Sequence, residues 1–255
     1  MAQAGKFRIG SILRDTFGVI WRNPMLCVGL TLIIYALPLS LWDWRSTAWF
    51  ASDDGEQPIG IMLVGMVGDV VVRAILQAAL TRATIEDLRG KRPSFRDCVK
   101  TALAVLLPSV AISLLVALGA WIGLLFLIVP GLFLMARWSV VIPALVQERV
   151  GVFAVMRRSR DLAKGSLWPL IGVWLLMFVA FMALSLVPAD FASLPDTGLG
   201  PFFDTLADTK PGLLFNTLAG IAIGLVQSIA PAAMYIELRR VKEGASVDEL
   251  AEIFS

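Results

Sequence analysis

The sequence contains no histidine, and its 255 residues include only two cysteines, Cys27 and Cys98. The absence of histidine removes the commonest general base and the commonest metal ligand. Two cysteines are too few for a disulfide framework or a cysteine-based metal site. The sequence also shows no phosphate-binding loop and no pattern of a catalytic triad. We therefore expect no enzymatic activity, no cofactor and no bound metal.

Charge is scarce as well. Charged residues make up 16% of the chain, whereas a soluble protein carries about 25%. Hydrophobic residues account for 58% and the mean hydropathy is +0.79. The net charge of +2 does not indicate a nucleic-acid partner. The N-terminus has no apolar segment followed by a cleavage site, so we expect no secretory signal peptide. The composition predicts an integral membrane protein.

The apolar runs predict six membrane-spanning helices, because one crossing needs about 20 apolar residues. One charge-free run, residues 101–136, would be about 54 Å long as a single helix, which is too long for one crossing. We predict that Val129-Pro130-Gly131 breaks it into a hairpin, since proline and glycine together favour a turn. The six predicted spans lie within residues 23–42, 57–81, 102–128, 131–147, 165–189 and 211–236.

The loop charges predict the orientation. Of the 22 lysines and arginines, 18 lie in the N-terminal segment, the two even-numbered loops and the C-terminal segment. The opposite loops hold Arg45, Lys210 and eight acids: Asp43, Asp53, Asp54, Glu56, Asp190, Asp196, Asp204 and Asp208. Because positive loops stay inside, we expect both termini in the cytoplasm.

Three similar units are visible along the chain. Pro24, Pro108 and Pro169 each open a span, and each follows an amphipathic stretch with a basic polar face. Such stretches are typical of helices that lie in the membrane interface. We predict three pseudo-repeats, at about 6–90, 93–150 and 151–244, within a single membrane domain covering residues 1–255. A capping box at Ser246–Glu249 predicts a separate interfacial tail over 245–255. The predicted fold is an all-α, polytopic membrane protein with three hairpins, each preceded by a cytoplasmic interfacial helix.

Four polar residues fall within predicted spans. Asp69, Arg73 and Gln77 follow the spacing i, i+4, i+8 and therefore share one face of the second span. Arg137 lies about 10 Å inside the fourth span by helical rise. Charges at this depth cost about 2.5–3.5 kcal/mol each on the insertion scale, so they usually face the bundle interior and pair. The four residues form either a polar site for a substrate or a structural ion-pair network.

Other charged residues lie at the predicted interface. Arg157, Arg158, Arg160 and Lys164 suit anionic lipid head groups, although the positive-inside bias explains them equally well. Glutamates close the second helix of each hairpin, where the helix dipole disfavours negative charge. We predict that an arginine of an interfacial helix clamps each of these glutamates, which are Glu86, Glu148 and Glu237.

Small residues and tryptophans complete the pattern. Gly119-x-x-x-Gly123 and Gly220-x-x-x-Gly224 each place two glycines on one helix face. Such faces allow close helix packing, either within one chain or between copies. Several tryptophans, including Trp21 and Trp168, lie at predicted water–lipid boundaries and are interpreted as interfacial anchors.

One stretch resembles a known family. The similarity is carried by Pro130-Gly131, Arg137-Trp138-Ser139, Pro143, Glu148, Gly151-Val152, Ala154, Arg158-Ser159, Leu162 and Gly165. This pattern resembles the membrane domain attached to some glycerophosphodiester phosphodiesterases and the related YciC-type bacterial inner-membrane proteins. A looser likeness covers residues 12–24 and 235–240. The resemblance implies a six-helix protein of the bacterial inner membrane that is associated with lipid. It brings no phosphodiesterase activity, because a chain without histidine lacks that enzyme's catalytic histidines.

Two functions remain open after the sequence is read. The first is a non-enzymatic scaffold or accessory protein associated with lipid or the cell envelope, with anionic lipids and a membrane protein as its expected partners. The second is a small transporter with a polar site formed by Asp69, Arg73, Gln77 and Arg137. A transporter would need a site reachable from water and a broken helix near the middle of the membrane.

Overall fold

A computed structural model describes residues 7–42, 59–126, 128–192 and 210–253, and within these ranges the chain is helical and contains no strand. Four of the described helical segments are long and apolar enough to cross a membrane: Pro24–Trp42, Ile59–Leu88, Gly131–Glu148 and Gly220–Gly244. Two further spans result if each of two bent helix pairs is counted as one crossing. The chain is therefore an all-α protein with several apolar helices of membrane-spanning length.

The first hairpin begins with helix α1 (Ile9–Arg22), which ends at Asn23 because a residue before proline disfavours the helical conformation. Pro24 then opens α2 (Pro24–Thr31) at a position where its missing N–H needs no partner. The helix continues as a π-helical segment, η1 (Leu32–Ala36), and runs on to residue 42.

The hairpin returns through α4 (Ile59–Leu88), whose 30 residues make a helix about 45 Å long. Its first half is mostly exposed, whereas the second half is largely buried from Ala74 onward. Gly90 follows the helix with φ 73°, the left-handed conformation that glycine adopts most easily after a helix end.

The second unit begins with α5 (Phe95–Ala104), which meets α6 (Leu106–Phe126) at a bend of 66°. The chain then reverses into α7 (Ile128–Trp138). The break predicted at Val129-Pro130-Gly131 is therefore displaced, because these residues lie in the first turn of α7. A first-turn N–H has no partner within the helix, so proline is tolerated there. The described interruption comes at Ser139-Val140, before α8 (Val141–Glu148).

The third unit starts with α9 (Val152–Ala163), which meets α10 (Leu167–Ala192) at a bend of 100°. Gly165, between them, has φ 92°. The last helix, α12 (Lys210–Ile253), has 44 residues and is about 66 Å long. It continues without interruption through Gly244 and Ser246, so the prediction of a separate tail helix is wrong. A glycine within a helix costs only about 1 kcal/mol, which is not enough to end it.

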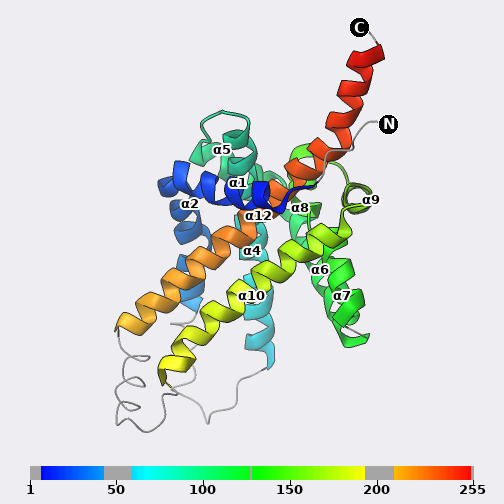
Figure 1. Cartoon of the computed structure of the whole chain (residues 1–255). Coiled ribbons are helices and arrows are strands. Elements are labelled where there is room, and N and C mark those ends of the chain that lie inside the picture. Colours follow the sequence, from blue (N-terminus) through cyan, green and yellow to red (C-terminus); the bar gives the residue numbers. More distant parts are fainter. Residues whose placement is uncertain (1–6, 43–58, 127, 193–209, 254–255) are drawn as a thin grey trace.

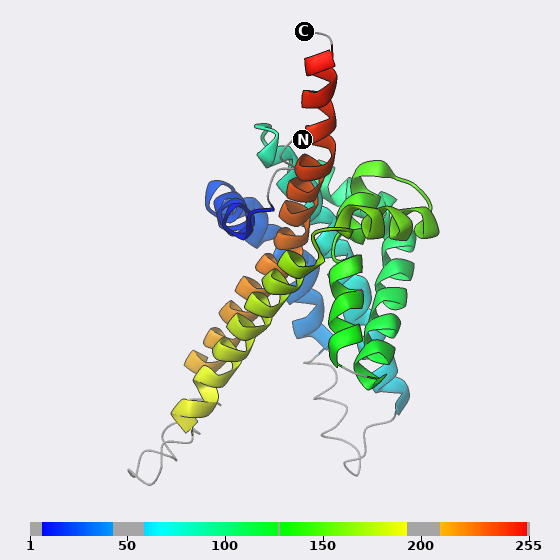
Figure 2. The ribbon, with the colours of Figure 1, turned by 45° about the vertical axis from the view of Figure 1, so that its right-hand side comes forward.

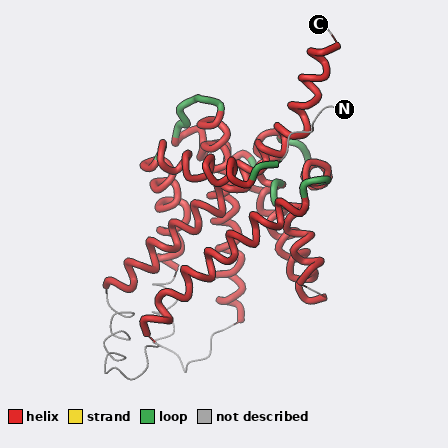
Figure 3. Tube along the Cα trace, viewed as in Figure 1, coloured by secondary structure: helices red, strands yellow, loops and turns green. Residues whose placement is uncertain are grey.

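The three amphipathic helices α1, α5 and α9 gather at one end of the molecule, together with both chain ends (Figures 1 and 2). The described loops also lie toward this end (Figure 3). From there α10 and the first part of α12 run in one direction, and α4, α6 and α7 run in another, so that the two groups diverge (Figure 2).

The buried core lies at the end that carries the amphipathic helices. There α12 packs against α1, α4, α8 and α9. Residues 141–146 of α8 are all buried, as are Met234, Tyr235 and Leu238 of α12. In contrast, Leu63 of α4 and Phe178 of α10, toward the opposite end, are 56% and 58% exposed. Exposed apolar side chains on spanning helices are suited to contact with lipid tails.

Candidate functional site

Asp69 and Arg73 form the ion pair that their spacing on α4 predicts. Nε of Arg73 donates to both carboxylate oxygens of Asp69, at 2.8 and 2.7 Å. The guanidinium carbon lies 5.0 Å from the ring centroid of Tyr35 in η1, which is a cation–π distance. The side chains remain 33% and 50% exposed, so the pair is not sealed inside the protein.

Arg73 and Gln77 also line a cavity of about 310 Å³. The cavity is bounded by α4, α6, α10 and the interruption between α7 and α8, and most of its wall is apolar. Trp174 of α10 contributes to the wall, and its buried indole Nε1 has no hydrogen-bond partner among the described residues. The remaining polar lining residues are Ser113, Trp138 and Ser139.

Gly119 allows one wall of this cavity to form. A Cβ atom at position 119 would lie 2.6 Å from the ring of Trp138 and 3.1 Å from Leu134, so only glycine lets α7 approach α6 this closely. Gly119, the first residue of this glycine pair, thus packs within the chain. At Gly220 and Gly224, an added Cβ would meet no described atom within 4 Å.

Arg137 does not belong to the polar group predicted from the sequence. It is exposed near the end of α7, and in the described ranges its side chain has no hydrogen bond or ion pair with Asp69, Arg73 or Gln77. Its backbone carbonyl instead accepts a hydrogen bond from Ser159 Oγ of α9 at 2.9 Å. This carbonyl is freed because the helix is interrupted two residues later, and α9 satisfies it.

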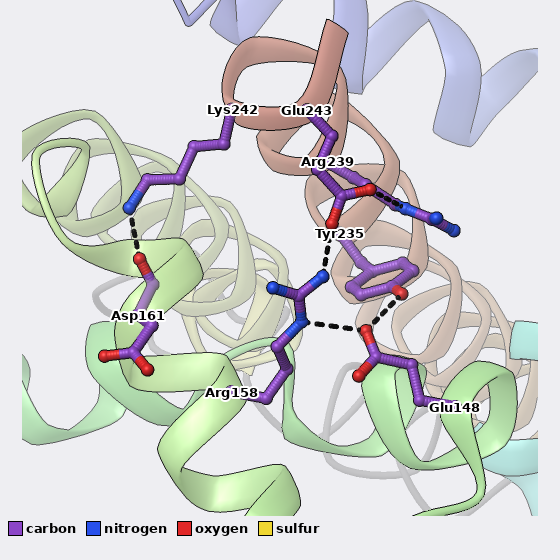
Figure 4. A network of polar contacts seen from close by, with 7 residues as sticks. All are labelled: Glu148, Arg158, Asp161, Tyr235, Arg239, Lys242 and Glu243. Carbon is purple, nitrogen blue, oxygen red and sulfur yellow. Dashed lines mark hydrogen bonds and ion pairs between the residues drawn. The ribbon is translucent and has the colours of Figure 1, made fainter. Parts of the chain in front are cut away.

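A second polar group ties α8, α9 and α12 together (Figure 4). Nε of Arg158 donates to Glu148 at 2.9 Å, and its other end pairs with Glu243. Tyr235 donates its hydroxyl to the same oxygen of Glu148 at 3.1 Å, and Arg239 pairs with Glu243. Glu148 is therefore held by an arginine of an amphipathic helix, as the sequence predicts.

The prediction that an arginine of an interfacial helix holds Glu86 is wrong, because that arginine holds the adjacent acid. Glu86 pairs with Arg82 of its own helix, at 2.5 Å. The carboxylate held from α1 belongs to Asp87, which accepts from Arg22 at 2.5 Å and from the Asn23 amide at 2.6 Å. The hydrogen bond to Asp87 raises the pKa of Arg22 above its ordinary value, so this guanidinium stays charged.

The clamp predicted for Glu237 is also different in kind. Its carboxylate accepts the backbone N–H of Arg8, at 3.3 Å, just before the first turn of α1. A negative charge at a helix N-terminus is favourable because it faces the positive end of the helix dipole. Glu237 thus anchors α1 through its backbone, without an arginine side chain.

The four residues predicted to contact lipid fall into two groups. Arg157, Arg160 and Lys164 are exposed on α9. Arg158 is half-buried and engaged with two glutamates, so the structure assigns it to the polar group of Figure 4 and the prediction of a head-group contact does not fit it.

No group of three or more acidic or cysteine side chains in the described part of the chain has the arrangement of a metal site. Comparison with protein families, curated proteins and solved structures gave no match. The arguments for function therefore depend on the geometry of this chain alone.

Several important residues were missed from the sequence. Asp87 is adjacent to the predicted clamp residue Glu86, and Glu243 lies six residues after Glu237. Both carry a suitable charge, but only the fold shows which acid reaches an arginine. Tyr35 and Trp174 lie in apolar runs that give no signal for a polar contact. The break at Ser139 does have a signal in the sequence, because Pro143 lies four residues later and has no N–H to donate to the Ser139 carbonyl.

Proposed function

We propose that this chain is a non-enzymatic integral membrane protein of the bacterial inner membrane, which serves as a scaffold or accessory protein and holds anionic lipid at its cytoplasmic face. The proposal includes six spans in three hairpins, each preceded by an interfacial helix. The order of elements supports it: α1, α5 and α9 each precede a helix that runs away from them. The bends of 66° and 100° fit an interfacial helix turning into a span. The sequence resemblance described above agrees with this proposal.

The single observation that carries the lipid proposal is the double character of the three amphipathic helices. Each buries one stripe against the body, such as Ile12 and Val19 in α1. Each also has large apolar side chains exposed on it or just beyond its end. These are Phe17 at 58%, Trp21 at 87%, Phe95 at 42%, Leu107 at 82%, Phe153 at 79% and Trp168 at 74%. Tryptophan and phenylalanine at this level favour the boundary between head groups and tails.

Exposed cations accompany these apolar groups. Arg14 lies on α1, Arg96 and Lys100 on α5, and Arg157 and Arg160 on α9, and all five are exposed. Each cation close to an anionic membrane surface contributes about 1 kcal/mol. Together, the apolar anchors and the cations form a surface suited to anionic lipid head groups.

The test compares two kinds of arginine on the same helix. The protein is extracted gently, and the retained lipids are measured by native mass spectrometry. Arg157→Gln with Arg160→Gln should reduce retained anionic lipid and leave the melting temperature nearly unchanged. Arg158→Gln should instead lower the melting temperature, because it leaves Glu148 and Glu243 facing each other. Unchanged lipid content in the double variant would mean that these arginines only set the topology.

The six-span topology has its own test. Cysteines introduced as Lys91→Cys and Lys242→Cys should react with an impermeant thiol reagent only after cell lysis. Asp53→Cys and Asp204→Cys, on the opposite predicted side, should react in intact cells. Reaction of the Lys91→Cys variant from outside would contradict the proposed orientation.

A second candidate function, transport of a small molecule, is favoured by the cavity beside the interrupted helix. Discontinuous helices line the substrate sites of many transporters. Here Ser139 lies in the interruption and Val141 directly after it, and both line the cavity with Arg73 and Gln77. The proposed site excludes Arg137, which is not among the described residues that line the cavity. Uptake into proteoliposomes that is lost in Gln77→Leu, with the protein still folded, would support transport over the scaffold role.

A further inference from the structure

We infer that the cavity between α4, α6, α7, α8 and α10 binds an uncharged amphiphile, with a hydrogen-bond-accepting oxygen on a short apolar body. The inference rests on the membrane setting and names the ligand class for the site of the transport candidate. It requires binding only, and no movement of the ligand across the membrane.

The volume of the cavity limits the size of the ligand that it can hold. A volume of about 310 Å³ is at the lower end of the range for small-molecule sites, which is roughly 300–1,000 Å³. At about 30 Å³ for each water molecule in the liquid, this equals about ten molecules of water. A body of about ten non-hydrogen atoms therefore fits, whereas a whole phospholipid does not.

Most of the ligand should be apolar because most of the cavity wall is apolar. Four elements contribute apolar side chains, among them Val70 of α4, Ile112 and Val116 of α6, Met135 of α7 and Ile142 of α8. Water gains few hydrogen bonds from such a wall, and an apolar group that replaces it gains free energy through burial.

The charge of the wall excludes ions of either sign. Among the described residues that line the cavity, Arg73 is the one that carries a charge, and Asp69 neutralises it from one turn away. An anion would have to compete with Asp69 for the guanidinium, and a cation would be repelled by Arg73. An uncharged ligand leaves the pair intact, so it avoids both penalties.

We infer an oxygen on the ligand because a side chain that lines the cavity has a hydrogen-bond donor without an acceptor. The indole Nε1 of Trp174 is buried and has no hydrogen-bond partner in the described part of the chain. Buried donors in proteins almost always have a partner. Gln77 adds an amide donor on the same wall. A hydroxyl or ester oxygen accepts from such groups and carries no charge.

The experiment uses an eight-carbon primary alcohol that carries a photoreactive diazirine on its chain. The full-length protein in detergent is irradiated with the probe, and labelled peptides are identified by mass spectrometry. Labelling should be saturable and centred on peptides that contain Met135, Ile142 or Val116. Octan-1-ol should compete with it, whereas octanoate and octylammonium should compete at least tenfold less well. Equal competition by octanoate would overturn the inference about charge.

Matched variants test the role of the indole nitrogen. Trp174→Phe keeps an aromatic ring but loses the N–H, so affinity should fall by about 2- to 12-fold, the effect of one ordinary hydrogen bond. Trp168→Phe, an exposed tryptophan on the same helix, is the control and should bind the probe normally. Equal affinity in Trp174→Phe and the wild type would show that the nitrogen binds only water or nothing.

A variant that fills the cavity tests whether the labelling occurs there. Ala117→Leu fills the cavity from α6 and should abolish the labelling. The α9 double variant Arg157→Gln with Arg160→Gln should label normally although it loses anionic lipid. The surface proposal and the cavity inference can therefore fail separately. Absence of saturable labelling in the folded wild-type protein would refute the cavity site.

Discussion

The ion pair between Asp69 and Arg73 allows a sharp test of the structure, because a third charge predicted to join it lies elsewhere. Asp69→Leu removes the carboxylate that holds Nε of Arg73 at 2.7 Å. Within the described ranges, Arg73 then keeps its contact with Tyr35. We expect this single change to destabilise the protein, and a second change, Arg73→Leu, to restore much of the loss.

The magnitude depends on the surroundings of the pair. In water, an exposed ion pair contributes about 0–1 kcal/mol, and its loss would be hard to detect. An arginine without a partner at the centre of a membrane costs about 2.5–3.5 kcal/mol. The remaining cation–π contact offsets about 0.5–1 kcal/mol of this, which leaves about 2 kcal/mol. For a chain of this size, that corresponds to a fall of about 4–8 °C in the melting temperature.

The assay is thermal unfolding in a mild detergent, followed by the fraction of protein that remains monodisperse after heating. Arg137→Leu in place of Arg73→Leu is the control, because Arg137 is exposed on α7 and, in the part of the chain described, has no hydrogen bond or ion pair with Asp69. Rescue by Arg73→Leu but not by Arg137→Leu is the expected result. An unchanged melting temperature in Asp69→Leu, or equal rescue by both second changes, would refute the pairing described here.

Three further predictions concern other contacts. Arg22→Gln should lower the melting temperature by about 2–8 °C, because the buried carboxylate of Asp87 loses a charged partner, at a cost of about 1–2 kcal/mol. Arg14→Gln, an 82% exposed arginine on the same helix, should leave the melting temperature within 1–2 °C in the same assay. Gly119→Ala should destabilise the protein by about 1–3 kcal/mol through its clash with Trp138. Gly29→Ala, where an added Cβ meets no described atom within 4 Å, should be neutral or stabilising by denaturation in the same detergent. Cys27 and Cys98 should not react with maleimide at pH 7 until the protein unfolds, because both are fully buried and burial raises the pKa of Cys98 to about 12. Rapid labelling of the folded protein would show that the core around these thiols opens.

The sequence predicts the local features of this structure well. The amphipathic helices follow from the spacing of apolar residues, and the contact between Asp69 and Arg73 follows from their separation of four residues. Both depend only on the geometry of one helix. Which of two adjacent acids meets a partner cannot be predicted in this way. Glu86 and Asp87 differ by about 100° around α4, and the position of α1 decides that Asp87 is the residue held.

Contacts between distant elements escape sequence reasoning for the same reason. Glu243 lies 85 residues from Arg158, and no periodicity connects them. The helix boundaries also depend on tertiary structure. Pro130 is tolerated within the first turn of α7, and Gly244 lies within α12, whereas the interruption at Ser139 is stabilised by a hydrogen bond from α9 to the carbonyl of Arg137.

The hydrogen bond between the backbone of Arg8 and Glu237 spans 229 residues, almost the length of the chain. It has a consequence for the order in which the protein is made. Synthesis proceeds at about 5–20 residues per second, so α1 emerges roughly 10–50 s before α12. During that interval α1 lacks its final partner, and only α2 and α4, among the helices it packs against most, are already present. The first helix of the chain therefore reaches its native position only after the last helix has been synthesised, and a chain truncated before Glu237 would leave α1 without this anchor.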